Sequence, residues 1–176
     1  DKSSNAQSNI VVLVNLNNLT TDEKKYAANM YNLILGGGSL ETKLYQKLRV
    51  ENSLCYNVGS MYQKYDGLII ITTSVDINKS KLAVQLIKTC LKEMKTNISD
   101  EELVNAKALV KTSLNMTNDN IGRIVDNAYY QNISDLDELD VRLDKFDKVS
   151  IRDVKKVAEK TSISTIYVLE GGSTNE

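Results

Sequence analysis

Short apolar runs separated by amphipathic stretches make up most of this chain, and their spacing predicts both strands and helices. Four segments have the β-branched or alternating pattern of strands, at residues 10–16, 54–62, 68–71 and 165–169. The tripeptide Tyr65-Asp66-Gly67 stands between the second and third segments and is typical of a β-hairpin turn. Every residue of 68–71 is apolar, so we expect this strand to be covered on both faces at its start.

Helix starts are marked by side chains that can cap a first turn. Thr20 followed by Glu23, and Ser99 followed by Glu102, are capping boxes, in which each side chain bonds the other residue's backbone amide. Shorter helices are predicted to begin near Ser134 and near Ser150. Apolar residues recur at helical spacing after these starts and elsewhere: Tyr26, Ala27, Met30, Tyr31 and Ile34; Leu82, Leu86, Ile87, Cys90, Leu91 and Met94; Leu103, Ala106 and Val110; and Ile121, Ile124, Val125, Ala128 and Tyr129.

The order of these elements predicts an α+β fold. Strands stand near both ends of the chain with a hairpin between them, and they do not alternate with helices throughout. This order favours a mostly antiparallel sheet of about four strands with helices packed on one face. We expect a lead-in or linker at residues 1–9, one α+β domain at 10–170 and a polar tail at 171–176. No internal repeat is evident.

Composition excludes several classes of function. The 176 residues include 22 Lys and Arg against 23 Asp and Glu, a net charge of -1, so no bulk charge favours nucleic acid or an anionic membrane. No apolar run approaches the roughly 18 residues of a membrane span, and the polar start does not resemble a signal peptide. We expect Cys55 and Cys90 to be reduced core thiols of a cytoplasmic protein, with a disulfide or a reactive site as alternatives.

The chain contains no histidine at all. It therefore cannot form a Ser-His-Asp triad, a Cys-His pair or the zinc motif H-x-x-E-H, and two separated cysteines cannot complete a structural zinc site. The expectation is that this chain holds no metal.

A triple-glycine turn is the least ordinary segment of the sequence. Gly36, Gly37 and Gly38 are costly to order, because glycine loses more backbone freedom on folding than any other residue. Ser39 is predicted to cap the helix that follows, and the amides there could bind an anion. The alternative is a tight helix-to-helix turn, since no Lys follows as in a P-loop. The helix is marked by leucines at every fourth position: Leu40, Leu44 and Leu48.

Arg49 and Tyr56 follow this helix. Taken separately, Arg49 is a cation at a helix C-terminus, where the helix dipole favours it, and Tyr56 is a core aromatic residue on a strand. Taken together behind a triple-glycine turn, they form a motif: Leu35-Gly36-Gly37-Gly38-Ser39, then Leu44, Leu48-Arg49 and Ser53-Leu54-Cys55-Tyr56.

This motif resembles the second homologous domain of the insulinase-like (pitrilysin) zinc metallopeptidases. In that family a glycine-containing turn precedes a helix that ends in Leu-Arg, and a Tyr stands seven residues after the Arg, as Tyr56 does after Arg49. The resemblance covers nearly the whole chain. One departure is Val50, which stands where the family commonly has an acidic residue, although Glu51 is adjacent.

The resemblance implies a definite role. Family members pair homologous α+β domains around a peptide, and the domain with H-x-x-E-H holds the zinc. In the family, an Arg and a Tyr of a later domain reach the zinc site, where they hold the substrate backbone or stabilise the oxyanion. The resemblance implies this role for Arg49 and Tyr56. By analogy with the mitochondrial processing relatives, Gly36 to Ser39 would help to bind substrate.

Three functions therefore stay open. The first is a substrate-binding, zinc-free domain, inactive alone, which supports peptide hydrolysis by a zinc-bearing domain or subunit; the parent would be a full-length peptidase or a non-catalytic paralogue. The second is an inactive scaffold of the same fold. The third is an anion- or phosphate-binding module that uses the glycine turn.

Overall fold

The computed structural model describes residues 2–3, 7–38, 40–118 and 136–172, together with 122, 125, 126, 128, 129 and 131. Its elements follow in chain order: β1 (Lys2–Ser3), β2 (Gln7–Leu16), η1 (Glu23–Ala27), α1 (Ala28–Leu35), α2 (Lys43–Tyr45), η2 (Gln46–Val50), β3 (Cys55–Gln63), β4 (Leu68–Asp76), η3 (Ile77–Lys79), α3 (Ser80–Thr96), α4 (Asp100–Asn118), α6 (Leu139–Lys148), α7 (Ile151–Glu159) and β5 (Thr161–Gly171).

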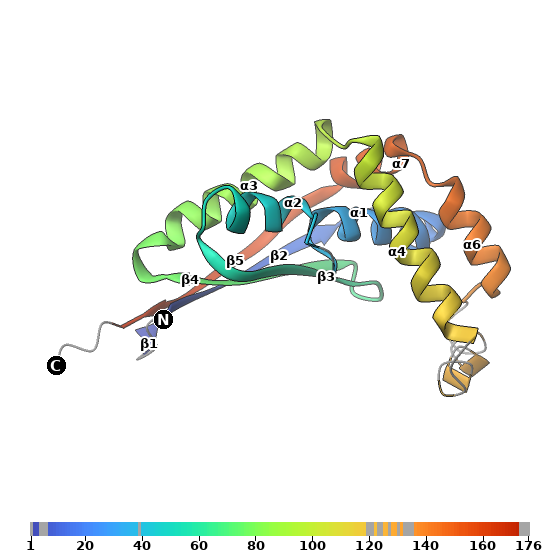
Figure 1. Cartoon of the computed structure of the whole chain (residues 1–176), viewed down its shortest axis with the longest axis horizontal. Helices are drawn as coiled ribbons and strands as arrows, with labels where there is room; N and C mark the ends of the chain where they lie inside the picture. The colour runs from blue at the N-terminus through green and yellow to red at the C-terminus, as the bar shows by residue number, and fades with distance from the viewer. Residues whose placement is uncertain are drawn as a thin grey trace.

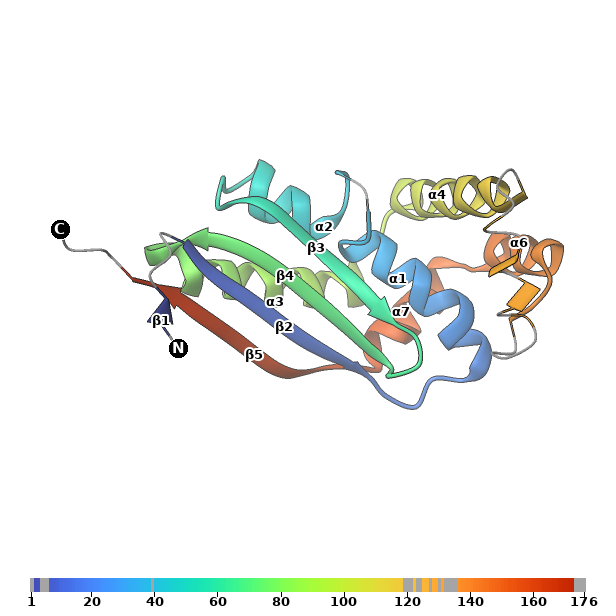
Figure 2. The ribbon, with the colours of Figure 1, turned by 90° about the horizontal axis from the view of Figure 1, so that it is seen from below.

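One sheet and one layer of helices make up the described part of the chain. The strand order is β1-β5-β2-β4-β3, in which the four long strands are antiparallel and only β1, two residues long, pairs in parallel with β5. The helices lie on one side of this sheet (Figure 1), and Figure 2 shows the strands from the opposite side. The predicted α+β class, with four main strands and helices on one face, is confirmed.

Strand β2 begins at Gln7, earlier than the predicted start at residue 10. Burial alternates along it from Ser8 onward, so the period-2 pattern already includes a polar residue. The backbone amide of Gly171 donates to the Ser8 hydroxyl, which satisfies that buried group and joins the two ends of the domain. β5 is likewise longer than the predicted 165–169, because its solvent-exposed serines and threonines lack the apolar signal.

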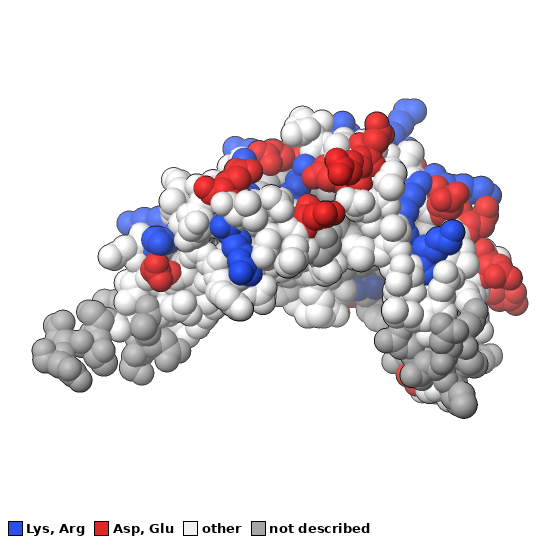
Figure 3. Space-filling view, in the orientation of Figure 1, with Lys and Arg blue, Asp and Glu red and all other residues white. Residues whose placement is uncertain are grey.

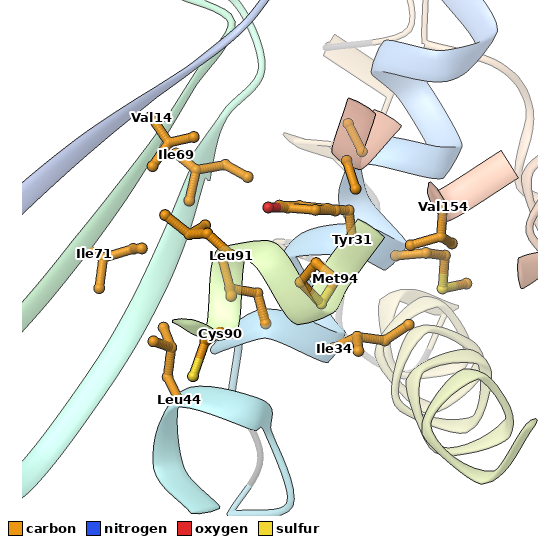
Figure 4. Close-up of a cluster of buried hydrophobic side chains, with 14 of the residues drawn as sticks. Val14, Tyr31, Ile34, Leu44, Ile69, Ile71, Cys90, Leu91, Met94 and Val154 are labelled. Carbon is orange, nitrogen blue, oxygen red and sulfur yellow. The ribbon is translucent and has the colours of Figure 1, made fainter. Parts of the chain in front are cut away.

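The core lies between the sheet and the helices (Figure 4). Ile69 and Ile71 project from β4 toward Leu91 and Met94 of α3, with Tyr31 of α1 beside them. Cys90 is also buried there, and burial raises the pKa of its thiol to about 12. Cys55 is half-buried, and both cysteines are free thiols.

Two predicted capping boxes are confirmed. Thr20 and Glu23 bond each other's backbone amides at 2.8 and 3.2 Å, and Ser99 and Glu102 do so at 2.8 and 3.1 Å. A further box starts α7 at Ser150, as expected for a helix beginning there.

The predicted start of the helix after the glycines is wrong. Helix α2 begins at Lys43, and Thr42 is its N-cap, with a side chain that accepts from the Tyr45 amide. Leu40 thus precedes the helix and is 66% exposed, whereas Leu44 and Leu48 are buried. Ser39 itself lies outside the described residues, as do Ile121, Ile124 and Ser134.

The second face of the sheet has no helix over it in the described part of the chain (Figure 2). Leu68 and Ile70 of β4 lie on this open face and are half-buried, so the expectation that both faces of 68–71 are covered is wrong. On the face shown in Figure 3, the Lys, Arg, Asp and Glu side chains lie mainly over the helices. No helix among the described residues has the length and hydropathy to cross a bilayer.

Candidate functional site

Arg49 and Tyr56 are in direct contact. Arg49 lies in the last turn of η2, and its Nη1 donates a 2.6 Å hydrogen bond to the Tyr56 carbonyl oxygen. The Arg49 Cζ is 4.7 Å from the centroid of the Tyr56 ring and 5.1 Å from that of Tyr45, one helical turn before it. The guanidinium is thus held by one hydrogen bond and two cation–π contacts. The structure therefore joins the two residues that sequence reasoning selected.

A β-bulge explains why Tyr56 points outward. Cys55 pairs with Val75 and Val58 pairs with Thr73, so Tyr56 and Asn57 together face a single residue of β4. Both bulge carbonyls are bonded by side chains: Arg49 donates to Tyr56, and the Thr73 hydroxyl donates to Asn57 at 2.9 Å. The Tyr56 side chain is 81% exposed, so it is not a core aromatic residue. A simple alternating strand would not predict this orientation.

The pair has unused hydrogen-bond donors. A guanidinium has five N–H groups, and none of the ion pairs among the described residues involves Arg49. The exposed Tyr56 phenol adds a further donor. Such donors suit a carbonyl oxygen, especially one that gains negative charge during a reaction.

Tyr56 also borders a cavity of about 480 Å³ on the open face of the sheet. Sequence reasoning missed this cavity because its walls combine the β3–β4 hairpin with β2, which lies about 40 residues earlier in the chain. The available signal was polar residues inside apolar strands, such as Asn9 and Ser74. The residues that line it are all uncharged: Gln7, Asn9, Ile10, Val11, Tyr56, Asn57, Thr72, Thr73 and Ser74.

The glycine turn makes its bonds internally. The amides of Gly36 and Gly37 both donate to the Asn32 carbonyl, at 2.9 and 2.8 Å, and the amide of Gly38 donates to the Gly36 carbonyl at 3.2 Å. The Gly36 carbonyl in turn accepts from the Ser60 amide of β3 at 3.0 Å. These three amides have internal partners, which favours the tight-turn interpretation over an anion cradle.

Packing requires the first two glycines. A Cβ on Gly36 would stand 2.7 Å from a methyl of Leu44 and 2.9 Å from the backbone nitrogen of Ser60. A Cβ on Gly37 would stand 2.9 Å from the Asn32 carbonyl oxygen. Gly38 differs, because its surroundings are open and its φ is +102°, a region that favours glycine.

The described residues do not provide a zinc site. The described residues contain no group of three or more His, Cys, Asp or Glu side chains that could hold a metal ion. Histidine is absent from the whole sequence, so the part of the chain that the structure describes offers no donor set for a catalytic zinc.

Charged residues gather in another place, around a cavity of about 540 Å³ between η1, α6 and α7. Lys145 pairs with Asp22 at 3.1 Å, and Lys160 pairs with Glu23 at 2.7 Å. Asp137 accepts from the Tyr26 hydroxyl, which, with nearby lysines, lowers the pKa of that carboxyl. These contacts join the helices to one another and are not part of the Arg49 site.

Known proteins share both the sequence pattern and the fold. The family described as "Peptidase M16 inactive domain" matches residues 1–110. The "Probable inactive metalloprotease YmfF" of Bacillus subtilis is 25% identical over 153 residues, which are 86% of this chain and 36% of that protein. The chain thus spans little more than a third of the length of this relative.

Solved structures agree on the fold. A conserved protein from Enterococcus faecalis superposes with a TM-score of 0.91 at 23% identity, over all of this chain and 42% of its own. A peptidase M16 inactive domain from Pseudomonas fluorescens gives 0.81 at 20% identity, over 98% of this chain and 42% of its own. The predicted resemblance to the insulinase-like family is confirmed. Because the family match covers residues 1–110 of 176, the chain belongs to the inactive domains of the M16, or insulinase-like, peptidase family.

Proposed function

We propose that this chain is a substrate-binding, zinc-free domain of an insulinase-like peptidase, in which Arg49 and Tyr56 hold the peptide backbone. A homologous domain or subunit bearing H-x-x-E-H would hold the zinc and supply the hydrolytic chemistry. On this proposal the chain alone cleaves no peptide.

The observation that supports this role is the contact between half-buried Arg49 and exposed Tyr56. A side chain that served only packing would be buried, yet Tyr56 is 81% exposed, and the bulge that directs it outward is fixed by two side-chain hydrogen bonds. Fixing a donor before substrate arrives reduces the entropy lost on binding, which is how preorganised sites gain affinity and rate.

The contribution of the pair follows from its donors. The free N–H groups of Arg49 and the phenol of Tyr56 would donate to a peptide carbonyl oxygen. When that oxygen gains negative charge, both hydrogen bonds strengthen, so the pair would stabilise the transition state more than the ground state. Neither residue needs to transfer a proton for this effect.

The decisive experiment is cleavage of a peptide by this chain combined with its zinc-bearing partner domain. We expect Arg49→Ala and Tyr56→Phe each to lower kcat/KM by roughly 100-fold, the range seen when one oxyanion donor is removed. Arg152→Ala and Tyr65→Phe are matched controls, because they remove the same groups from exposed positions outside the site. Unchanged turnover with a native fold would contradict the proposal.

A second candidate is an inactive scaffold, and one observation favours it: a relative matching 86% of this chain is described as a probable inactive metalloprotease. On that view the open face of the sheet serves assembly alone. Peptide binding separates the two candidates. A scaffold would bind its partner domain with the same affinity in wild type and Arg49→Ala and would bind no peptide.

We also propose a cytoplasmic location, supported by the two free thiols and the balanced charge. Fractionation of cells that express the full-length parent protein would test it. Recovery in a membrane or extracytoplasmic fraction would contradict it.

A further inference from the structure

We propose that the uncharged cavity beside Tyr56 is a specificity subsite, which accepts a neutral side chain of the bound peptide and rejects charged ones. This inference rests on the proposed peptide-binding function and adds the class of side chain that the site would select.

The cavity is connected to the candidate site through Tyr56, which contacts Arg49 on one side and lines the cavity on the other. A peptide whose carbonyl accepts from Arg49 or Tyr56 would therefore place a neighbouring side chain over β2 and β4. A volume of about 480 Å³ is more than a single side chain occupies and falls within the range of ligand pockets in proteins.

The polar groups of the cavity are those of amides and hydroxyls. The Ser74 hydroxyl donates to Asn9 Oδ1 at 2.6 Å, which fixes the Asn9 amide and leaves its NH₂ group as a donor. Asn9 and Ser74 pair across β2 and β4, so both side chains lie on the same, open face. Asn57 and Gln7 add amides that can donate or accept. This set matches an amide, a hydroxyl or a small apolar side chain.

Charge selects against the alternatives. None of the nine residues that line the cavity is charged, so a Lys, Arg, Asp or Glu side chain would lose hydration without gaining an ion-pair partner from the lining. The carboxylate next to the cavity in the register, Asp76 opposite Gln7, is paired with Lys79 at 2.9 Å. The lining of the cavity thus offers a charged ligand no compensating ion pair.

The test uses the docked assembly, which is this chain in complex with its zinc-bearing partner domain. Fluorescent peptides are compared that differ at one position, where each has Gln, Ala, Lys or Glu. The position is moved along the peptide in turn, and affinity is measured by anisotropy. We expect one position at which Gln and Ala bind about tenfold more tightly than Lys and Glu, a difference of the size of one partly compensated charge.

The variant Asn9→Asp should shift the side-chain preference of the cavity toward a positive charge. A carboxylate keeps the acceptor for the Ser74 hydroxyl and adds one negative charge, so the preference at that position should move about tenfold toward Lys. Asn15→Asp is the matched control on the same strand and face, about 20 Å away. Asn57→Asp gives the same charge from β3 if Asn9→Asp unfolds.

The outcomes separate this inference from the function on which it rests. A shift toward Lys in Asn9→Asp or Asn57→Asp, absent from Asn15→Asp, supports the subsite. The subsite alone would be overturned if the side-chain preference shifted equally in all three variants. It would also be overturned if the preference did not shift while peptide affinity still depended on Arg49 and Tyr56. Peptide binding that ignores Arg49 and Tyr56 would overturn the proposed function first.

Discussion

Two segments with irregular backbone differ in what they present to solvent: the glycine turn that packs against β3, and the bulge within β3. The amides of Gly36 to Gly38 donate to the nearby Asn32 and Gly36 carbonyls, and the Gly36 carbonyl also accepts a hydrogen bond from the Ser60 amide of β3. The bulge at Tyr56 and Asn57, on the strand itself, has its carbonyls bonded by Arg49 and Thr73 and turns an aromatic side chain to solvent.

The comparison shows that unusual backbone is not by itself a sign of function. Both segments have irregular backbone. The described amides of the turn are bonded internally, whereas the bulge presents the Tyr56 phenol and contacts Arg49, which has N–H groups left for a ligand. The glycines are explained by the closeness of helix and strand, since a Cβ at Gly36 would meet both Leu44 and Ser60. The useful question for each segment is which hydrogen-bonding groups remain after the fold has formed.

The largest expected effect comes from Gly36→Ala. The new Cβ would stand 2.9 Å from the Ser60 backbone nitrogen, and neither chain can move without breaking the bond from Ser60 to Gly36. We expect a loss of about 3 kcal/mol in the free energy of unfolding, measured by urea denaturation.

Gly38→Ala is the matched control for that variant. Nothing lies within 4 Å of its added Cβ, so only the strain of φ +102° remains, and we expect a loss of about 1 kcal/mol. If Gly36→Ala and Gly38→Ala were equally stable, the close approach of Leu44 and Ser60 would not explain why glycine stands at position 36. A loss of peptide affinity in Gly38→Ala at native stability would instead give the turn a binding role.

Thr73→Val should show the next largest effect. The substitution keeps the shape of a buried side chain but removes the hydroxyl that bonds the Asn57 carbonyl. We expect about 1.5 kcal/mol of lost stability, together with lower turnover in the docked assembly, because Tyr56 would no longer be held outward. Thr73→Ser restores the hydroxyl and should recover turnover; no difference between the Val and Ser variants would mean that Arg49 alone fixes the bulge.

The sequence was sufficient for the fold where local signals were strong. The capping boxes at Thr20 and Ser99 and the hairpin turn at Tyr65 are short-range patterns, and each formed where the residues predicted. The Arg49–Tyr56 contact was also predictable, because a fixed spacing within a family motif encodes a helix end and the strand that returns to it.

The remaining features depend on tertiary register. Alternation from Leu54 placed Tyr56 inside, but the extra residue of the bulge reverses the side on which it lies, and register is set by β4. Thr42 rather than Ser39 caps α2, because helix start depends on how the glycine turn packs against β3. The neutral cavity combines β2, β3 and β4, and no window of sequence contains all three.

A smaller effect is expected from acid, and it should separate the helical layer from the bulge. The hydrogen bonds that hold the bulge are accepted by carbonyl oxygens. In contrast, the segment just before α6 is joined to η1 through the Asp137 carboxylate, whose pKa is lowered by the Tyr26 hydroxyl and nearby lysines. A lowered pKa means that this stabilisation is present above about pH 4 and is lost as the pH falls through the folded value.

Asp137→Asn should therefore cost about 1 kcal/mol at pH 7 and nothing near pH 2, by urea denaturation at both values. Asp140→Asn removes an exposed carboxylate three residues later, in the first turn of α6; it is the control and should be neutral at both pH values. Amide exchange at Tyr56 and Asn57 should not change between wild type and Asp137→Asn at pH 7. A loosened bulge in that variant would show that the two regions are coupled.

The smallest effect tests how Arg49 itself is held. Tyr45 contributes only a ring face at 5.1 Å, and a cation–π contact at an accessible site is worth about 0.5 kcal/mol. Tyr45→Leu should thus lower kcat/KM of the docked assembly about twofold and broaden the Nε–H NMR signal of Arg49, while Tyr45→Phe leaves both unchanged. If the Leu and Phe variants behave alike, the hydrogen bond to the Tyr56 carbonyl positions the guanidinium alone. A loss of kcat/KM much greater than twofold in Tyr45→Leu, with intact stability, would mean that the cation–π contact with Tyr45, and not the bulge, positions Arg49 for a peptide.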